Sequence, residues 1–101
     1  MPSRREKPYS QTLSNILDNT DIILDVITPE GTLVHKNVGR VELPGAVGRF
    51  VVLKDHAPLI TALRKGEIAY GASEGKVDGT IQISSGFVEI CGNHVIACVE
   101  L

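Results

Sequence analysis

The chain has 101 residues and a formal net charge of −2 at neutral pH, with 43% hydrophobic and 22% charged residues. This length fits one small domain with a modest core, and the composition is that of an ordinary globular protein. The sequence shows no clustered basic face for nucleic-acid binding, and no apolar stretch approaches the roughly 20 residues needed for direct insertion across a membrane.

The first twenty residues form a polar segment that differs from the rest of the chain. Within this segment, Ser10 can cap a short helix whose apolar positions are Leu13, Ile16 and Leu17. One or two turns of isolated helix are marginal in water. We therefore expect residues 1–20 to be an N-terminal tail, disordered or with a short helix, ahead of a single domain over residues 21–101.

From Asp21 onward, short apolar or alternating runs typical of β-strands follow one another. Residues 22–27 form a dense apolar run, and residues 39–43 alternate between polar and apolar. Residues 50–53 are apolar on both faces, which predicts a strand near the middle of a two-layer core. Further strands are predicted at residues 59–63, 67–70, 80–84, 87–90 and 94–99.

Segments rich in glycine, proline and asparagine separate these runs. They include Pro29-Glu30-Gly31, Pro44 to Gly48, Lys65-Gly66, Ser73 to Gly75, Asp78-Gly79, Ser85-Gly86 and Gly92-Asn93. Glycine and asparagine tolerate the positive φ that tight turns require. Many short strands with turns about every 8–12 residues indicate an all-β sandwich or barrel. Because aromatic residues are scarce, its core should consist mainly of Val, Ile and Leu.

The most conspicuous polar group is Lys54-Asp55-His56. A carboxylate beside an imidazole is a component of acid–base catalysis, but no nucleophile or metal site completes it. Neighbours on an extended strand also point to opposite faces. We interpret the group as a turn in which Asp55 caps backbone amides and His56 lies at a surface. No catalytic residue is predicted.

The sequence likewise predicts no metal or cofactor site. His35, His56 and His94 could be combined into a zinc site, but they lie in separate elements without the paired spacing of metal ligands. Gly45 and Gly48 lack the lysine and the Ser or Thr of a phosphate-binding loop. The two cysteines, Cys91 and Cys98, are too few for a disulfide framework, which favours a reducing cytoplasmic setting.

Four segments carry a more specific pattern, and their order and spacing resemble the N-terminal sandwich domain of the epsilon subunit of bacterial ATP synthases. They are Ile22 to Gly31, Val41-Glu42-Leu43-Pro44-Gly45, Gly48 to Leu53, and Asp55-His56-Ala57-Pro58-Leu59-Ile60-Thr61-Ala62-Leu63, followed by Lys65-Gly66. Ser85 to Glu89 resembles a later strand of that family, with a shortened glycine pair. The likeness extends over roughly residues 22–101.

The resemblance implies a flattened β-sandwich of about ten short strands. It also implies a non-catalytic rotor subunit of the central stalk, peripheral at the cytoplasmic face of the bacterial inner membrane. In that family, one side of the sandwich binds the gamma subunit and the other lies against the membrane ring of c subunits, so that proton flow is coupled to ATP synthesis. Matched position by position, the gamma-facing residues are Thr28, His56 and Thr61. The c-ring-facing residues are Gly45, Ala46, Val47, Gly48 and Arg49.

Two departures from the family pattern limit what is carried over. Most members continue into a helical hairpin that inhibits ATP hydrolysis and in some cases binds ATP, whereas this sequence ends at Leu101, so neither property is expected here. Arg49 stands where related sequences often have an acidic residue, so a charge pairing with the ring is not assumed. Two other functions remain open: a free-standing β-sandwich adaptor that binds a partner through the His56 edge, and a small hydrolase that uses Asp55 and His56.

Overall fold

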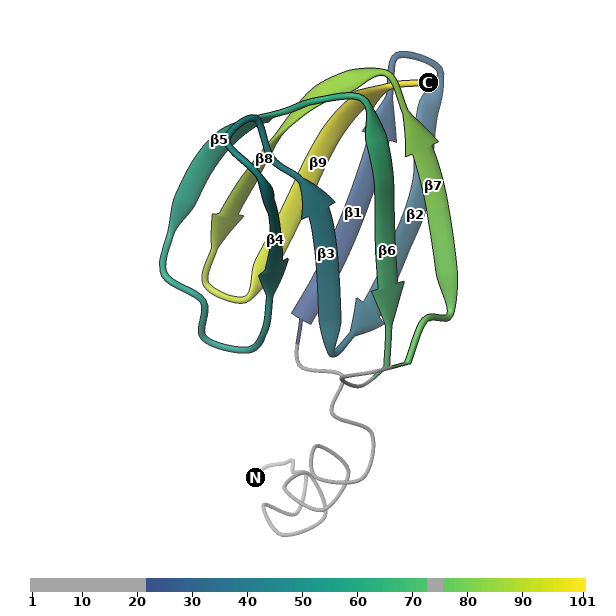
Figure 1. The fold of residues 1–101 in the computed structure, drawn as a ribbon. Coiled ribbons are helices and arrows are strands. Elements are labelled where there is room, and N and C mark those ends of the chain that lie inside the picture. The colour runs from purple at the N-terminus through teal and green to yellow at the C-terminus, as the bar shows by residue number, and fades with distance from the viewer. Residues whose placement is uncertain (1–21, 73–75) are drawn as a thin grey trace, which may run out of the picture.

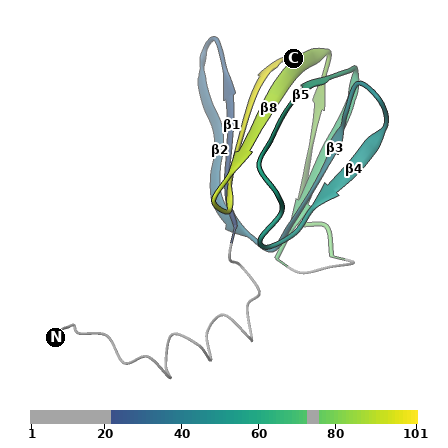
Figure 2. The same cartoon turned by 90° about the vertical axis from the view of Figure 1, so that its left-hand side faces the viewer.

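The computed structural model describes residues 22–72 and 76–101, so the predicted tail of residues 1–20 lies outside the described residues. The described part consists of nine β-strands in two sheets packed face to face, as Figures 1 and 2 show. It offers no helical segment long and apolar enough to cross a membrane. The predicted all-β sandwich of about ten strands is therefore confirmed. The strands are β1 (Ile22–Thr28), β2 (Gly31–Val38), β3 (Arg40–Pro44), β4 (Arg49–Val52), β5 (Leu59–Leu63), β6 (Gly66–Gly71), β7 (Gly79–Ile83), β8 (Ser85–Cys91) and β9 (His94–Glu100).

The two sheets have the strand orders β2-β1-β9-β8-β5 and β4-β3-β6-β7. Neighbouring strands are antiparallel except for β1 and β9, which run parallel and join the first and last strands of the domain. The chain changes sheet after β2, β4, β5 and β7. Loops at both ends of the sandwich therefore bridge the two sheets.

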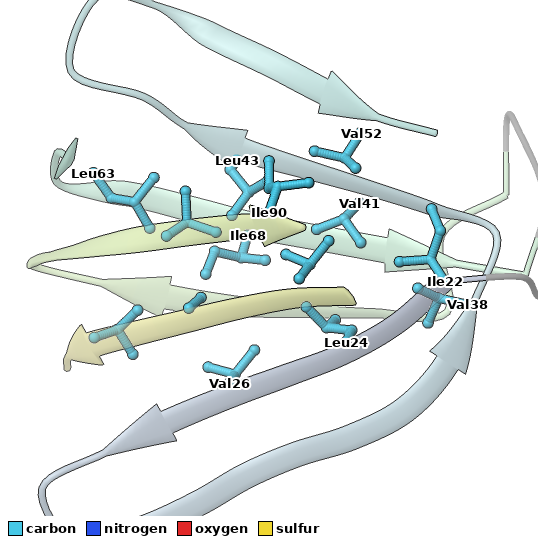
Figure 3. Close-up of a cluster of buried hydrophobic side chains, with 14 of the residues drawn as sticks. Ile22, Leu24, Val26, Val38, Val41, Leu43, Val52, Leu63, Ile68 and Ile90 are labelled. Carbon is cyan, nitrogen blue, oxygen red and sulfur yellow. The ribbon is translucent and has the colours of Figure 1, made fainter. Parts of the chain in front are cut away.

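The core lies between the sheets and is aliphatic, as predicted. Alternate residues of most strands are buried, for example Ile22, Leu24 and Val26 of β1, which are 0% exposed. Figure 3 shows how they meet the inward-facing residues of the opposite sheet, such as Leu43 and Ile68. Burial of each such side chain contributes about 1.5–3 kcal/mol to folding.

Two sequence-based predictions about strands were wrong. Residues 50–53 were expected near the middle of the core, but β4 pairs only with β3 and is an edge strand. Val52 is buried, whereas Leu53 lies beyond the strand with 40% of its surface exposed. An apolar pattern on both faces cannot distinguish a central strand from an edge strand whose outer residues are only partly covered.

The second error was the omission of β2. This strand has mostly exposed side chains, so its sequence shows no alternation between buried and exposed positions. Its extended backbone is fixed by antiparallel pairing with β1, and the pairing is irregular between Val26 and Ile27. The hydrogen bonds to β1, and not the side-chain pattern of β2, define this strand.

Candidate interaction surfaces

The turn between β3 and β4, which carries the residues expected to face the c ring, is bonded to both sheets. The turn is closed by a hydrogen bond from the amide of Gly48 to the carbonyl of Gly45 at 3.2 Å. The amide of Ala46 donates to the carbonyl of Ala62 at 2.9 Å, and that of Arg64 donates to the carbonyl of Pro44 at 2.9 Å. The turn is therefore held against the end of β5 in the opposite sheet, with its tip, Val47, 99% exposed.

Two glycines in this turn have different surroundings. A Cβ atom added to Gly45 would lie 2.7 Å from the carbonyl oxygen of Gly48 and 2.9 Å from the ring of Phe50. A Cβ atom added to Gly48 would have no atom within 4 Å. Gly45 is thus required by close packing, whereas Gly48 faces open space.

Arg49 is paired within the chain. Its Nε donates to Oε2 of Glu42 at 2.9 Å, and the other oxygen of Glu42 lies 3.6 Å from Nη1 of Arg40. The three side chains lie on the outer face of the four-stranded sheet. Exposed pairs of this kind contribute only about 0–1 kcal/mol, so Arg49 remains available to a partner at small cost.

The three residues expected to face the gamma subunit do not form one cluster. Thr28, 7% exposed, lies at the end of β1, where its hydroxyl donates to the carbonyl of Gly31 and accepts from the amide of Glu30. His56 lies at the opposite end of the sandwich, in the loop between β4 and β5. Thr61, in β5, lines a hollow of about 300 Å³ together with Gly45, Val47, Gly48 and Arg49. The structure therefore brings Thr61 beside the residues that were expected to face the ring.

The predicted turn before His56 is present and is closed by the amide of His56, which donates to the carbonyl of Leu53 at 3.2 Å, but the partner of Asp55 differs from the expected one. The carboxylate of Asp55 accepts a hydrogen bond from the side-chain amide of Asn93 at 3.1 Å, so its partner is a distant side chain and not a local backbone amide. His56 is half-buried at the surface and its Nδ1 donates to the carbonyl of Ala57 at 2.7 Å. Because the two side chains bind different partners, the carboxylate does not orient the imidazole as a catalytic base would require.

A polar cluster that the sequence did not predict lies on the outer face of the five-stranded sheet. Asp25 of β1 is hydrogen-bonded through one oxygen to Nδ1 of His35 in β2, and through the other to Nε2 of His94 in β9 at 2.6 Å. Two of the three histidines considered as zinc ligands therefore meet, but around a carboxylate and without His56. In the parts of the chain that the structure describes, no group of three or more His, Cys, Asp or Glu side chains is arranged to hold a metal ion.

The hydrogen bonds from His94 and His35 hold the pKa of Asp25 below its ordinary value of 3.8. Because the folded-state pKa is lowered, the stabilisation is present above the unfolded-state pKa and is lost as the pH falls through the folded-state value.

Asp25→Asn should lower the free energy of unfolding at neutral pH by about 1–3 kcal/mol, the scale of hydrogen bonds to a charged group. The free energy of unfolding of this variant should also fall less steeply than that of the wild type as the pH drops below 3.8. Urea unfolding as a function of pH measures both effects, with His56→Gln as a control; an unchanged acid limb in Asp25→Asn would contradict the assignment.

The outer faces of the two sheets differ in polarity. On the five-stranded sheet, Ile60 and Phe87 are 72% and 57% exposed, and Ile27, Ile96 and Cys98 are half-buried on the same face, where Glu89 lies directly opposite Ile60. On the four-stranded sheet, the outward positions of β3, β6 and β7 are mostly polar, namely Arg40, Glu42, Glu67, Thr80 and Gln82. An exposed apolar area on one face of a small protein is typical of an interaction surface. Beside it, Thr28, Phe87 and Cys98 help to line a hollow of about 490 Å³.

Comparisons with known proteins agree with this fold. Residues 21–100 match the sequence model of the family described as ATP synthase, Delta/Epsilon chain, beta-sandwich domain. The ATP synthase epsilon chain of Chlorobaculum tepidum is 40% identical over 77 residues, which cover 76% of this chain and 86% of the relative. That of Carboxydothermus hydrogenoformans is 43% identical over 75 residues, covering 74% of this chain but 54% of the relative.

Solved structures share the same architecture. A chain in the central stalk and c-ring structure of the Tetrahymena thermophila mitochondrial ATP synthase aligns with a TM-score of 0.68 and 14% identity, covering 80% of this chain and 64% of that one. A chain in the Euglena gracilis mitochondrial ATP synthase gives a TM-score of 0.71 and 22% identity, covering 79% and 51%. At these identities, the likeness shows the fold alone.

Proposed function

Because the chain belongs to the family of the ATP synthase delta/epsilon β-sandwich domain, we propose that it is a non-catalytic subunit of the central stalk that links the gamma subunit to the c ring. The match over residues 21–100, the nearly complete sandwich, carries this proposal. In this role the subunit transmits rotation and couples proton flow to ATP synthesis. It is placed peripherally, at the cytoplasmic face of the bacterial inner membrane, and needs no cofactor.

The proposed gamma-binding side is that of the five-stranded sheet. Thr28 and Thr61 belong to strands of this sheet, although both side chains alternate toward its inner side, and His56 lies in the loop that leads into it. Its outer face carries the exposed side chains of Ile60 and Phe87. Burying such residues against a partner supplies most of the affinity of an interface, whereas the polar face of the other sheet is suited to water.

The proposed c-ring contact is the turn of residues 45–49. Its tip is uncharged and small, so a partner can approach its backbone closely, and Val47 offers an exposed apolar side chain. Arg49 adds a donor group that Glu42 already holds in place. Shape should therefore matter more than charge at this contact, since an exposed ion pair contributes little.

His56→Ala should weaken binding of the gamma subunit by about 1–2 kcal/mol, the scale of a modest interface contact, without unfolding the sandwich. Isothermal titration of the purified gamma subunit with the wild-type and variant chains measures this difference. Gln82→Ala, on the outer face of the other sheet, is the matched control and should bind as the wild type does. Equal affinities for His56→Ala and wild type, with both chains folded, would remove His56 from the interface.

A further inference from the structure

Asn93 connects three segments at one end of the sandwich. It is the second residue of the two-residue turn between β8 and β9, where Gly92 and Asn93 have φ values of 58° and 63°, as a type I′ turn requires. Its backbone carbonyl accepts a hydrogen bond from the amide of Ile23 in β1 at 3.0 Å. Its side chain reaches the loop between β4 and β5, which lies 38 positions away in the sequence.

The contact between Asn93 and that loop is reciprocal. The backbone amide of Asp55 donates to Oδ1 of Asn93 at 2.6 Å, and Nδ2 of Asn93 donates to Oδ1 of Asp55 at 3.1 Å. Both residues have left-handed backbone conformations, and the φ of Asp55 is 65°. Aspartate and asparagine adopt this conformation more readily than other non-glycine residues, but it still has to be stabilised.

The loop has little burial to hold it in place. Leu53, Lys54, Asp55, Ala57 and Pro58 are all exposed, and His56 is half-buried. The loop also crosses from the four-stranded to the five-stranded sheet, so neither sheet continues its hydrogen-bond ladder through it. Within the loop, the amide of His56 donates to the carbonyl of Leu53 at 3.2 Å, and the paired hydrogen bonds with Asn93 tie the backbone directly before His56 to the rest of the sandwich.

We propose that Asn93 is a positioning residue for the gamma interface, because its hydrogen bonds to Asp55 set the loop conformation that presents His56. The inference rests on the proposed function, in which His56 faces the gamma subunit. Asn93 itself need not touch gamma: it acts by holding Asp55 in the left-handed conformation, which sets the direction of the chain at the next residue. Loss of this contact lets the loop sample other conformations. Binding of gamma must then order the loop again, which lowers the affinity.

The test introduces a repulsion between two carboxylates at positions 55 and 93 and then removes it by exchanging the two residues. N93D places two carboxylates against each other, which should raise the hydrogen exchange rate of the Asp55 amide by about tenfold and weaken gamma binding by about 5–10-fold. The exchanged pair D55N/N93D again has one amide and one carboxylate, each tolerant of positive φ, so both measurements should return to within about twofold of wild type. A residue with a merely general role in stability would not be rescued by the exchange.

A further variant, N93G, tests the contribution of the Asn93 side chain itself. N93G preserves the turn geometry but removes the side chain, and it should show the same faster exchange and weaker binding as N93D. Wild-type exchange rates at Asp55 in N93G, or a D55N/N93D chain as impaired as N93D, would overturn the proposal. Exchange is measured on the chain alone, so a wild-type chain that fails to bind gamma would refute the proposed function, while the exchange data would still decide whether Asn93 orders the loop.

Discussion

The double substitution of Ile60 and Phe87 by aspartate is expected to weaken binding to the gamma subunit by roughly 100-fold or more while the sandwich remains folded. Ile60 and Phe87 are diagonal neighbours on β5 and β8, and both point outward from the five-stranded sheet. In a complex, two carboxylates placed there would lose their water without gaining partners, which is costly at the centre of an interface. In the free chain the same carboxylates remain hydrated, so stability should change little.

The matched control carries two aspartates on the opposite face of the sandwich, at Thr80 and Gln82 of β7. This variant has the same added negative charge and should bind gamma nearly as the wild type does. Analytical ultracentrifugation and titration calorimetry with purified gamma measure both variants. Equal losses of affinity in the two variants would mean that net charge, and not the apolar face, governs the interaction.

Gly45→Val should destabilise the turn that is proposed to face the c ring, and it should impair the coupling assigned to this turn. The new side chain would collide with the backbone carbonyl of Gly48 and with the ring of Phe50. Overpacking of this kind costs about 1–3 kcal/mol, and each kcal/mol lowers the melting temperature by roughly 4–8 °C in a domain of this size. Thermal unfolding measures the first effect, and ATP-driven proton pumping by the reconstituted complex measures the second.

Gly48→Ala is the control in the same turn, because open space surrounds the added methyl group. It should change the melting temperature by no more than a degree or two, which corresponds to a few tenths of a kcal/mol. A Gly45→Val chain as stable as Gly48→Ala would show that the turn can rearrange. If the Gly45→Val chain is less stable but the complex that contains it pumps protons normally, the turn does not take part in the ring contact.

Local signals in the sequence were sufficient for most of the fold. Strict alternation identified β3, and the dense apolar runs identified β1 and β9, because their inward residues form the core. The segment around Pro44-Gly45 predicted the turn between β3 and β4, where Gly45 is required by close packing. The segment from Asp55 to Leu63 indicated the family, which the comparisons confirm over residues 21–100.

Features that depend on pairing between distant strands could not be predicted in this way. The Asp25 cluster requires β2 beside β1 on one side and β9 on the other. Since β2 has no buried alternation and the β1–β9 pair joins the two ends of the domain, neither neighbour could be inferred from local pattern. The partnership of Asp55 with Asn93 likewise depends on a turn that becomes adjacent only when the sandwich closes.

The proposed role in the central stalk is tested most directly by reconstitution. Membranes that carry the ATP synthase of the same organism are stripped of their own epsilon subunit, and the purified chain is added back while ATP synthesis is driven by an imposed proton gradient. The chain is expected to bind together with the gamma subunit and restore synthesis, whereas the Ile60 and Phe87 double aspartate variant should not. Membranes that remain uncoupled after addition of the folded wild-type chain would contradict this role.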